Sequence, residues 1–265
     1  MALTTIKKTA AQPAQRLSSV ASALRLLKVF SAEESELGIT ALAKTLGLAK
    51  STVHRLTSTL VSEGFLTQNP EDGRYRLGLS LFALGTLVRR RMDVSSQALS
   101  FLHELRDRTN ETVHLAVLEQ GDIMYMFNLE SHQAIRMRSY LGVRKPAFCT
   151  SEGRAILAFS PPALVTSQLE SCLIARTAKT CTDPAVLRKL LAAVRVNGYA
   201  LDDEESEEGM RGVAAPIRDA GGTVIAAVGI AGPVQRLTKK SLRGFTPWVV
   251  DAADGISARL GHRSD

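Results

Sequence analysis

A pair of short helices separated by a tight turn, predicted within residues 38–64, restricts the fold more than any other feature of the sequence. Thr40 stands where a hydroxyl can cap a helix over residues 41–46, and Gly47 follows that helix as a residue able to end it. Upstream, apolar residues recur at helical spacing and predict another helix over residues 19–30. The spacing of these elements predicts a helix-turn-helix unit.

The helix predicted after the turn is apolar on one side and polar on the other. Val53, Leu56 and Leu60 fall within one narrow sector, and the helix contains no acidic residue before Glu63. Such a polar face can enter a major groove without repelling phosphates, and an arginine on it can donate two hydrogen bonds to guanine. Along the two helices, the residues expected to contact DNA are Thr40, Lys50, Ser51, Thr52, His54, Arg55 and Ser58.

Two short strands are predicted next, over residues 65–68 and 74–77, joined by turn-forming residues. Arg74 and Arg76 alternate with Tyr75, so both guanidinium groups leave the same side of the strand and can reach phosphate or a minor groove. We therefore add both arginines to the expected DNA contacts. The complete segment predicts a winged helix-turn-helix that binds double-stranded DNA.

The net charge of +7 is confined to the first third of the chain. Residues 1–91 hold 13 lysines and arginines and 6 acidic residues, whereas residues 92–265 hold 20 of each kind. This distribution is expected of a phosphate-binding module attached to a domain with another task. On charge alone, a basic surface without a partner is an equal alternative.

The length of 265 residues favours two domains with separate cores. No apolar run approaches the roughly 20 residues of a membrane span, and the amino terminus lacks a secretory signal pattern. We expect a cytoplasmic protein without membrane contact, with a disordered leader over residues 1–18. The division predicted after it is a winged helix-turn-helix over 19–78, a linker helix over 79–92 and a larger domain over 93–265.

The larger domain is expected to be of the α+β class, with helices packed on a largely antiparallel sheet. Helices are predicted over residues 94–108 and 246–260 and, with Asp183 as cap and Pro184 as first residue, up to Gly198. Strands are predicted over residues 112–119, 123–128, 134–139, 199–201, 212–217 and 223–230.

Known catalytic and cofactor-binding motifs are missing from the sequence, so we expect neither an enzyme nor a cofactor. The acidic run over residues 202–208 lacks the alternating ligands of a calcium loop, which favours a solvated loop and no metal site. Cys149 can be a reactive thiol at a helix start, but a small buried side chain is the favoured interpretation.

Several longer stretches are similar to one protein family. The run GITALAKTLGLAKSTVHRLTSTLVSEGFL, followed by YRLG, resembles the DNA-binding domain of the IclR family of bacterial transcription regulators. LGVRKPAFCTSEGRAILA and NGYALDDEESEEGMRGVAAPIRDAGGTVIAAVGIAGP resemble two segments of its carboxy-terminal domain. The resemblance implies a homodimer or dimer of dimers on a DNA operator, and a GAF-like domain that binds a small carboxylate effector.

A helix predicted to begin near Thr150 and Ser151 offers N–H groups and hydroxyls to a carboxylate, although either residue can also be a simple cap. By resemblance, the effector site further includes Asp202, Met210, Gly212, Gly229 and Ala231. The last three stand where glyoxylate-responsive relatives carry a cysteine and two serines. We therefore expect a roomier and more apolar site that favours an aromatic or otherwise bulky carboxylate. Glu152 would repel such an anion unless its side chain points outward.

These features together predict a sequence-specific DNA-binding transcription regulator that acts as a repressor. A transcriptional activator of a catabolic operon is the alternative, since some members of the family activate. An architectural DNA-binding protein without an effector is a further alternative, which the large neutral domain disfavours. A metabolite-binding enzyme whose winged segment mediates assembly is disfavoured by the missing catalytic motifs.

Overall fold

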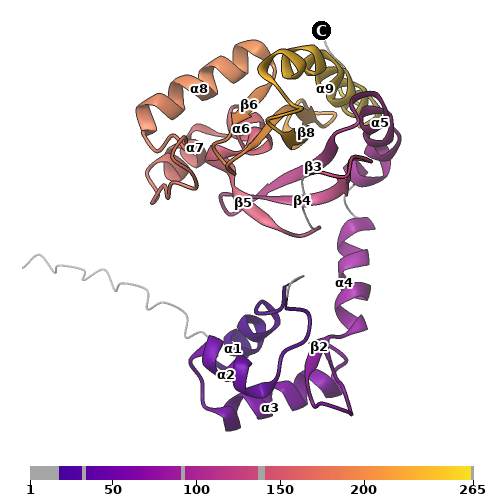
Figure 1. The fold of residues 1–265 in the computed structure, drawn as a ribbon, viewed down its shortest axis with the longest axis vertical. Coiled ribbons are helices and arrows are strands. Elements are labelled where there is room, and N and C mark those ends of the chain that lie inside the picture. The colour runs from indigo at the N-terminus through magenta and orange to yellow at the C-terminus, as the bar shows by residue number, and fades with distance from the viewer. Residues whose placement is uncertain (1–17, 32–33, 91–92, 137–140, 264–265) are drawn as a thin grey trace, which may run out of the picture. The chain divides into compact units, whose positions relative to one another are not determined.

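Three helices, a two-stranded hairpin and a fourth helix make up the amino-terminal third of the chain (Figure 1). The computed structural model describes residues 18–31, 34–90, 93–136 and 141–263, and its two units span Met1–Arg89 and Arg90–Asp265. The first elements are α1 (Ser18–Leu27), α2 (Ile39–Leu46), α3 (Lys50–Ser62), β1 (Leu66–Gln68), β2 (Tyr75–Leu77) and α4 (Leu79–Arg90). The leader predicted over residues 1–18 lies, except for Ser18, outside the described residues.

A small apolar core holds the three helices and the hairpin together. Leu26 of α1, Leu42 of α2 and Val53 of α3 are fully buried, and they cluster with Leu66 and Tyr75 of the hairpin. In α1 the buried face differs from the predicted apolar stripe, because Leu26 is fully buried whereas Val20 and Leu24 are exposed. The winged helix-turn-helix predicted for this segment is thus present as a folded unit.

The start of α2 differs from the prediction, whereas its end agrees. Gly47 has a φ of 65° and ends the helix in the left-handed conformation, as predicted. Thr40 does not cap the helix, because α2 already begins at Ile39 with Gly38 at the cap position and no side-chain cap bond. The Thr40 side chain is exposed instead.

Gly78, at the junction of the hairpin and α4, allows a close backbone approach. A Cβ atom there would lie 2.1 Å from the Gly64 carbonyl oxygen, whereas a Cβ atom on Gly85 of α4 would meet nothing within 4 Å. Gly78→Ala should therefore lower the free energy of unfolding of this unit by about 1–3 kcal/mol, and Gly85→Ala should raise it by about 1 kcal/mol. Hydrogen exchange of the α1–α3 amides measures both effects. Equal exchange rates in the two variants would contradict the prediction.

Six antiparallel strands in the order β5-β4-β3-β8-β7-β6 form the sheet of the second unit. Its strands are β3 (Thr112–Glu119), β4 (Asp122–Leu129), β5 (Arg144–Pro146), β6 (Ala200–Asp203), β7 (Met210–Arg218) and β8 (Val224–Pro233). Its helices are α5 (Asp93–Thr109), the 3-10 turn η1 (Ala147–Cys149), α6 (Ser151–Leu157), α7 (Pro162–Leu169), α8 (Pro184–Asn197) and α9 (Lys239–Arg259). The predicted α+β class is confirmed.

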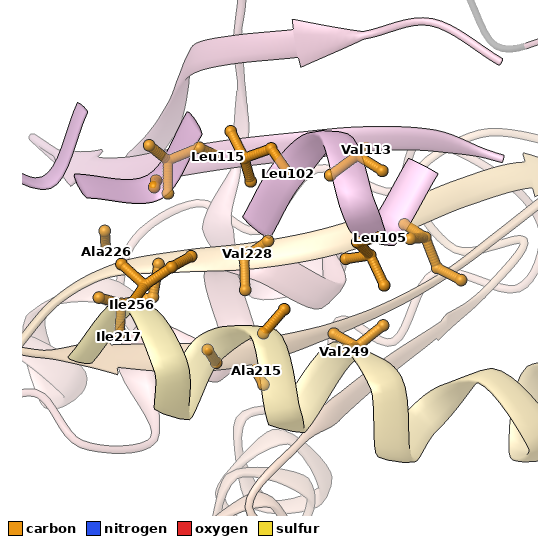
Figure 2. Packing of buried hydrophobic residues seen from close by; sticks show 14 of the residues in the cluster. Leu102, Leu105, Val113, Leu115, Ala215, Ile217, Ala226, Val228, Val249 and Ile256 are labelled. Carbon is orange, nitrogen blue, oxygen red and sulfur yellow. The ribbon is translucent and has the colours of Figure 1, made fainter. Parts of the chain in front are cut away.

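The sheet lies between two helical layers, each packed on an apolar face. On one face, side chains of α5 and α9 interleave with those of β3, β7 and β8 (Figure 2). The labelled members are Leu102, Leu105, Val113, Leu115, Ala215, Ile217, Ala226, Val228, Val249 and Ile256. On the other face, α6, α7 and α8 cover a second cluster. Side chains alternate along a strand. The strand residues that lie between the labelled strand residues of Figure 2 therefore face α6.

Several element predictions for this unit are confirmed. The hairpin of β3 and β4 forms as expected, and the Asp183 side chain accepts hydrogen bonds from two N–H groups at the start of α8. Pro184 is the first residue of α8, and Gly198 ends it with a φ of 78°. Short-range signals of this kind depend on the local backbone alone, which is why they are readable without the fold.

Two predicted elements are wrong, and α7 was not predicted. The last helix begins at Lys239 rather than at Thr246, because the Thr238 side chain caps it and buried Leu242 and Val249 hold it on the sheet across exposed Pro247. The strand predicted over residues 134–139 does not form at 134–136, where the chain bends at 134 and 135, and residues 137–139 lie outside the described part of the chain.

Candidate nucleic-acid interface and small-molecule site

Helix α3 buries one side and exposes the other. Val53 and Thr57 are fully buried, and Leu56 and Leu60 are half-buried. Burial of Thr57 was not predicted; its hydroxyl donates to the His54 carbonyl at 3.0 Å, which satisfies it inside the helix. All seven predicted DNA contacts on α2 and α3 are exposed, namely Thr40, Lys50, Ser51, Thr52, His54, Arg55 and Ser58.

The hairpin places its two arginines on either side of a buried tyrosine. Tyr75 is 4% exposed, whereas Arg74 and Arg76 point to solvent. Arg74 Nε lies 3.7 Å from Asp72 Oδ2, and Arg76 Nη1 lies 3.9 Å from Glu36 Oε1. Exposed pairs of this kind are weak and screened, so both guanidinium groups stay available to phosphate. Arg74 also lines the same open hollow as Thr40.

In the second unit, the strand register brings several predicted site residues into neighbouring positions. Asp202 of β6 pairs with Gly212 of β7, which pairs with Ala231 of β8, which pairs with Thr112 of β3. On the same face, Gly229 of β8 lies between Ala214 of β7 and His114 of β3. Met210 of β7 lies opposite Pro233 of β8. The α6-facing side of the sheet therefore carries all five of the predicted strand residues.

The hydroxyls predicted at the start of α6 are engaged within the protein. Thr150 Oγ1 accepts a hydrogen bond from the Gly153 N–H at 3.3 Å and donates to the Pro146 carbonyl at 3.1 Å. Ser151 Oγ donates to Glu152 Oε2 at 3.0 Å. Thr150 thus caps α6, which is the simple alternative that the sequence left open, and Ser151 supports a neighbouring carboxylate.

Glu152 points inward, a direction that the sequence did not settle. It is 3% exposed, and its Oε1 atom lies 3.3 Å from Nδ1 of fully buried His114. Burial alone raises the pKa of Glu152, but the His114 ring, the residue's own backbone N–H and Ser151 lower it overall, so the carboxylate is ionised. Sequence analysis missed His114, although a polar residue at an inward position of an apolar strand was a usable signal.

Gly212 and Gly229 do not leave the additional room that their small size suggested. A Cβ atom on Gly212 would lie 2.9 Å from Ser151 Oγ, and one on Gly229 would lie 3.1 Å from Glu152 Oε1. The side chains of Ser151 and Glu152 therefore take up the space above the two glycines. The expectation of a roomier site is wrong at these two positions, because side chains of α6 occupy the space beside the two glycines.

Tyr125 and Asp202 complete the polar part of this site. The Tyr125 ring packs on His114 with centroids 4.5 Å apart, and burial followed by the charges of Glu152 and Asp202 raises its pKa. Asp202 accepts hydrogen bonds from the N–H groups of Glu205 at 2.8 Å and Ser206 at 3.3 Å. Burial nevertheless raises the pKa of Asp202 to about 6.

The raised pKa of Asp202 predicts a pH effect on stability. Because the folded state binds its proton more tightly than the unfolded state, this stabilisation is present below the ordinary aspartate pKa and is lost as pH rises through about 6. Between about pH 5 and pH 7.5 the wild type should lose roughly 1 kcal/mol more than Asp202→Asn. Urea unfolding followed by fluorescence of Trp248 measures this, with exposed Asp107→Asn as control. Parallel pH profiles of wild type and Asp202→Asn would contradict it.

The acidic run over residues 202–208 is largely paired with basic side chains. Arg154 forms two contacts of 2.6 Å with Glu205, and Lys145 Nζ lies 2.9 Å from Glu207 Oε2. Asp203 contacts Arg211 at 2.5 Å. These pairs fasten the loop to α6, β5 and β7.

Cys149 is fully buried. Burial and the nearby Asp202 charge raise the pKa of its thiol to about 11, so the thiol stays protonated. The favoured interpretation, a small buried side chain, agrees with this environment.

Comparisons with known proteins agree with both units. Two family models match, the IclR helix-turn-helix domain over residues 19–70 and the bacterial transcriptional regulator IclR C-terminal model over residues 86–258. The HTH-type transcriptional regulator XynR of Escherichia coli (strain K12) is 35% identical over 247 residues, which cover 93% of this chain and 98% of XynR. The transcriptional repressor IclR of the same organism is 31% identical over 249 residues, which cover 93% and 91%.

A solved structure is similar over most of the chain. The crystal structure of an IclR homologue from Microbacterium hydrocarbonoxydans, complexed with 4-hydroxybenzoate, is 28% identical with a TM-score of 0.81, covering 91% of this chain and 98% of that one. None of the described helices is long and apolar enough to span a membrane. The chain therefore belongs to the IclR family of DNA-binding transcription regulators and is not an enzyme.

Proposed function

We propose that this regulator represses transcription as a homodimer on an operator, and that a small organic acid bound in the second unit alters its affinity for DNA. The exposed face of α3, free of acidic residues and next to a basic hairpin, carries the proposed DNA contacts. Repression is supported by the name of the related repressor IclR. Activation of a catabolic operon is the alternative.

In the proposed complex, α3 enters the major groove. Arg55 donates two hydrogen bonds to a guanine, Lys50 contacts phosphate at the start of the helix, and Arg74 and Arg76 contact phosphate or the minor groove. The proposed division is a DNA-binding domain over residues 19–78, a linker helix over 79–92 and an effector domain over 93–265. A protein with this task acts in the cytoplasm, where the DNA is.

The proposed dimer is supported by apolar residues on α4. Leu79, Phe82 and Leu87 are 84%, 73% and 58% exposed, which is unfavourable for a free helix in water. A second copy of the chain can cover this face through a two-fold axis. Two copies would then present their α3 helices to successive major grooves, about 34 Å apart. A dimer of dimers is compatible with the same contact.

The proposed effector is a carboxylate bound in the second unit beside Asp202 and Ala231, near the start of α6. Support comes from the 4-hydroxybenzoate in the related structure. Next to an anion, Asp202 binds a proton more tightly and then donates a hydrogen bond to it. To change occupancy of the operator, the ligand must bind the DNA-competent and DNA-incompetent states with different affinities.

The test is the affinity of the full chain for the DNA upstream of its own gene and for scrambled DNA, at two salt concentrations, with and without organic acids. We expect preferential binding that weakens with salt, because phosphate contacts release counterions, and we expect one acid to change it. Equal, weak binding to both DNAs that no acid alters would contradict the proposal and favour an architectural protein.

A further inference from the structure

Two buried polar side chains of the effector domain have hydrogen-bonding capacity that the protein does not use. The ionised Glu152 carboxylate can accept about four hydrogen bonds, and the donors described above are His114, Ser151 and its own backbone N–H. Tyr125 is 3% exposed, and its hydroxyl forms no hydrogen bond with the other residues that the structure describes. This hydroxyl can therefore donate a hydrogen bond to a polar group of a ligand.

The two residues share a neighbour, His114, on the α6-facing side of the sheet. Both contact His114, Tyr125 through its ring at 4.5 Å and Glu152 through Oε1 at 3.3 Å. Gly229 contributes no side chain there, and a Cβ atom on it would already lie 3.1 Å from Oε1. The position of this carboxylate is therefore fixed by His114 and Ser151.

The charge balance around this point is unfavourable for a second anion. Arg154 of α6 is held by Glu205, and Lys145 of β5 is held by Glu207. A carboxylate next to Glu152 would therefore meet an ionised acid while these two cations are already paired. A hydroxyl group, in contrast, can accept from Tyr125 and donate to Glu152 at the same time.

We propose that Glu152, positioned by His114 and Ser151, determines which effectors this domain accepts: it binds a hydroxyl group of the effector and excludes a carboxylate at that end. This inference rests on the proposed effector-binding role of the domain. The effector is then a monocarboxylic acid that also bears a hydroxyl group, with its acid group toward Asp202. Unsubstituted acids and dicarboxylic acids of the same skeleton bind more weakly.

Calorimetry on the full chain with two matched series tests this. The aromatic series is benzoate, 4-hydroxybenzoate and terephthalate, and the aliphatic series is butyrate, 4-hydroxybutyrate and succinate. In at least one series the hydroxy acid should bind the wild type about 10-fold or more tightly than both partners, since a hydrogen bond to a charged group has that effect. Glu152→Gln should reduce the preference for the hydroxy acid over the dicarboxylic acid by about 10-fold. Glu208→Gln, which removes the same charge from an exposed position, should leave this preference unchanged.

Two further variants separate recognition from folding. Tyr125→Phe should reduce the preference for the hydroxy acid over the unsubstituted acid. Glu152→Asp keeps the charge but withdraws the acceptor by one methylene, so it should still exclude dicarboxylates while losing the hydroxyl preference. A loss of fold would abolish binding of every probe equally, and fluorescence of Trp248 in α9 detects it.

Equal affinity of the wild type for hydroxy and unsubstituted acids in both series overturns the inference, as do unchanged preferences in Glu152→Gln. Both results leave the effector role intact. Failure of all six probes to bind the wild type also overturns it. If another compound then altered operator binding, the proposed function would stand. If no compound altered operator binding, the proposed function would be overturned as well.

Discussion

Replacing Glu205 with alanine should lower the free energy of unfolding of the second unit by about 3–5 kcal/mol. Arg154 faces Glu205 through two contacts of 2.6 Å, and 4% and 14% of the two side chains are exposed. Arg154 also donates to the Phe148 carbonyl at 2.8 Å, which keeps it buried when its partner is removed. An unpaired charge in the protein interior accounts for the size of the effect.

The matched control is Glu119→Ala. Glu119 pairs with Arg144 at the surface, where 46% and 41% of the side chains are exposed, so its loss should cost at most about 1 kcal/mol. Urea unfolding followed by fluorescence of the single tryptophan reports on this unit. Removing both charges with Arg154→Met and Glu205→Leu should restore much of the stability. Similar losses for Glu205→Ala and Glu119→Ala would show that burial of the pair has no energetic consequence.

Replacing Arg55 with alanine should weaken operator binding by about 2–6 kcal/mol, because each subunit of the proposed dimer loses a base contact of about 1–3 kcal/mol. Arg55 is exposed on α3, on the face opposite buried Val53. The loss should relax discrimination at one base pair in each half-site, while binding to scrambled DNA changes little. Titration of operator variants with single base changes measures this.

Two other variants separate base contacts from the general effect of charge. Lys50→Ala should weaken binding to all DNA sequences alike and reduce its salt dependence, as expected of a phosphate contact. Arg188→Ala, which removes an exposed charge from α8, should have little effect. If Arg55→Ala weakened binding to operator and scrambled DNA equally, Arg55 would be a phosphate contact and not a base contact.

The elements that the sequence predicted well are those with strong local signals. The hairpin of β3 and β4, the capped start of α8 at Pro184 and the end of α2 at Gly47 depend on turn and cap residues that act within a few positions. The start of α9 was misplaced because Pro247 is a common first helical residue. Only the packing of Leu242 and Val249 on the sheet shows that the helix continues on both sides of Pro247.

The candidate sites differ in the same way. The residues proposed to contact DNA were readable from the sequence because a helix and a strand have fixed periods, so exposure on α3 and on the hairpin follows from spacing alone. The proposed effector site joins α6 to β3, β4, β6, β7 and β8, which are far apart in the chain, and spacing carries no information about such contacts.

By itself, the amino-acid sequence determined that this chain has a basic winged helix-turn-helix, a neutral α+β domain and membership of a regulator family. Only the tertiary structure decided the direction of Glu152, its contact with His114 and the use of the space above Gly212 and Gly229. The physical reason is that a buried carboxylate is stabilised by donors from other elements, and those donors are brought to it by the fold of the sheet.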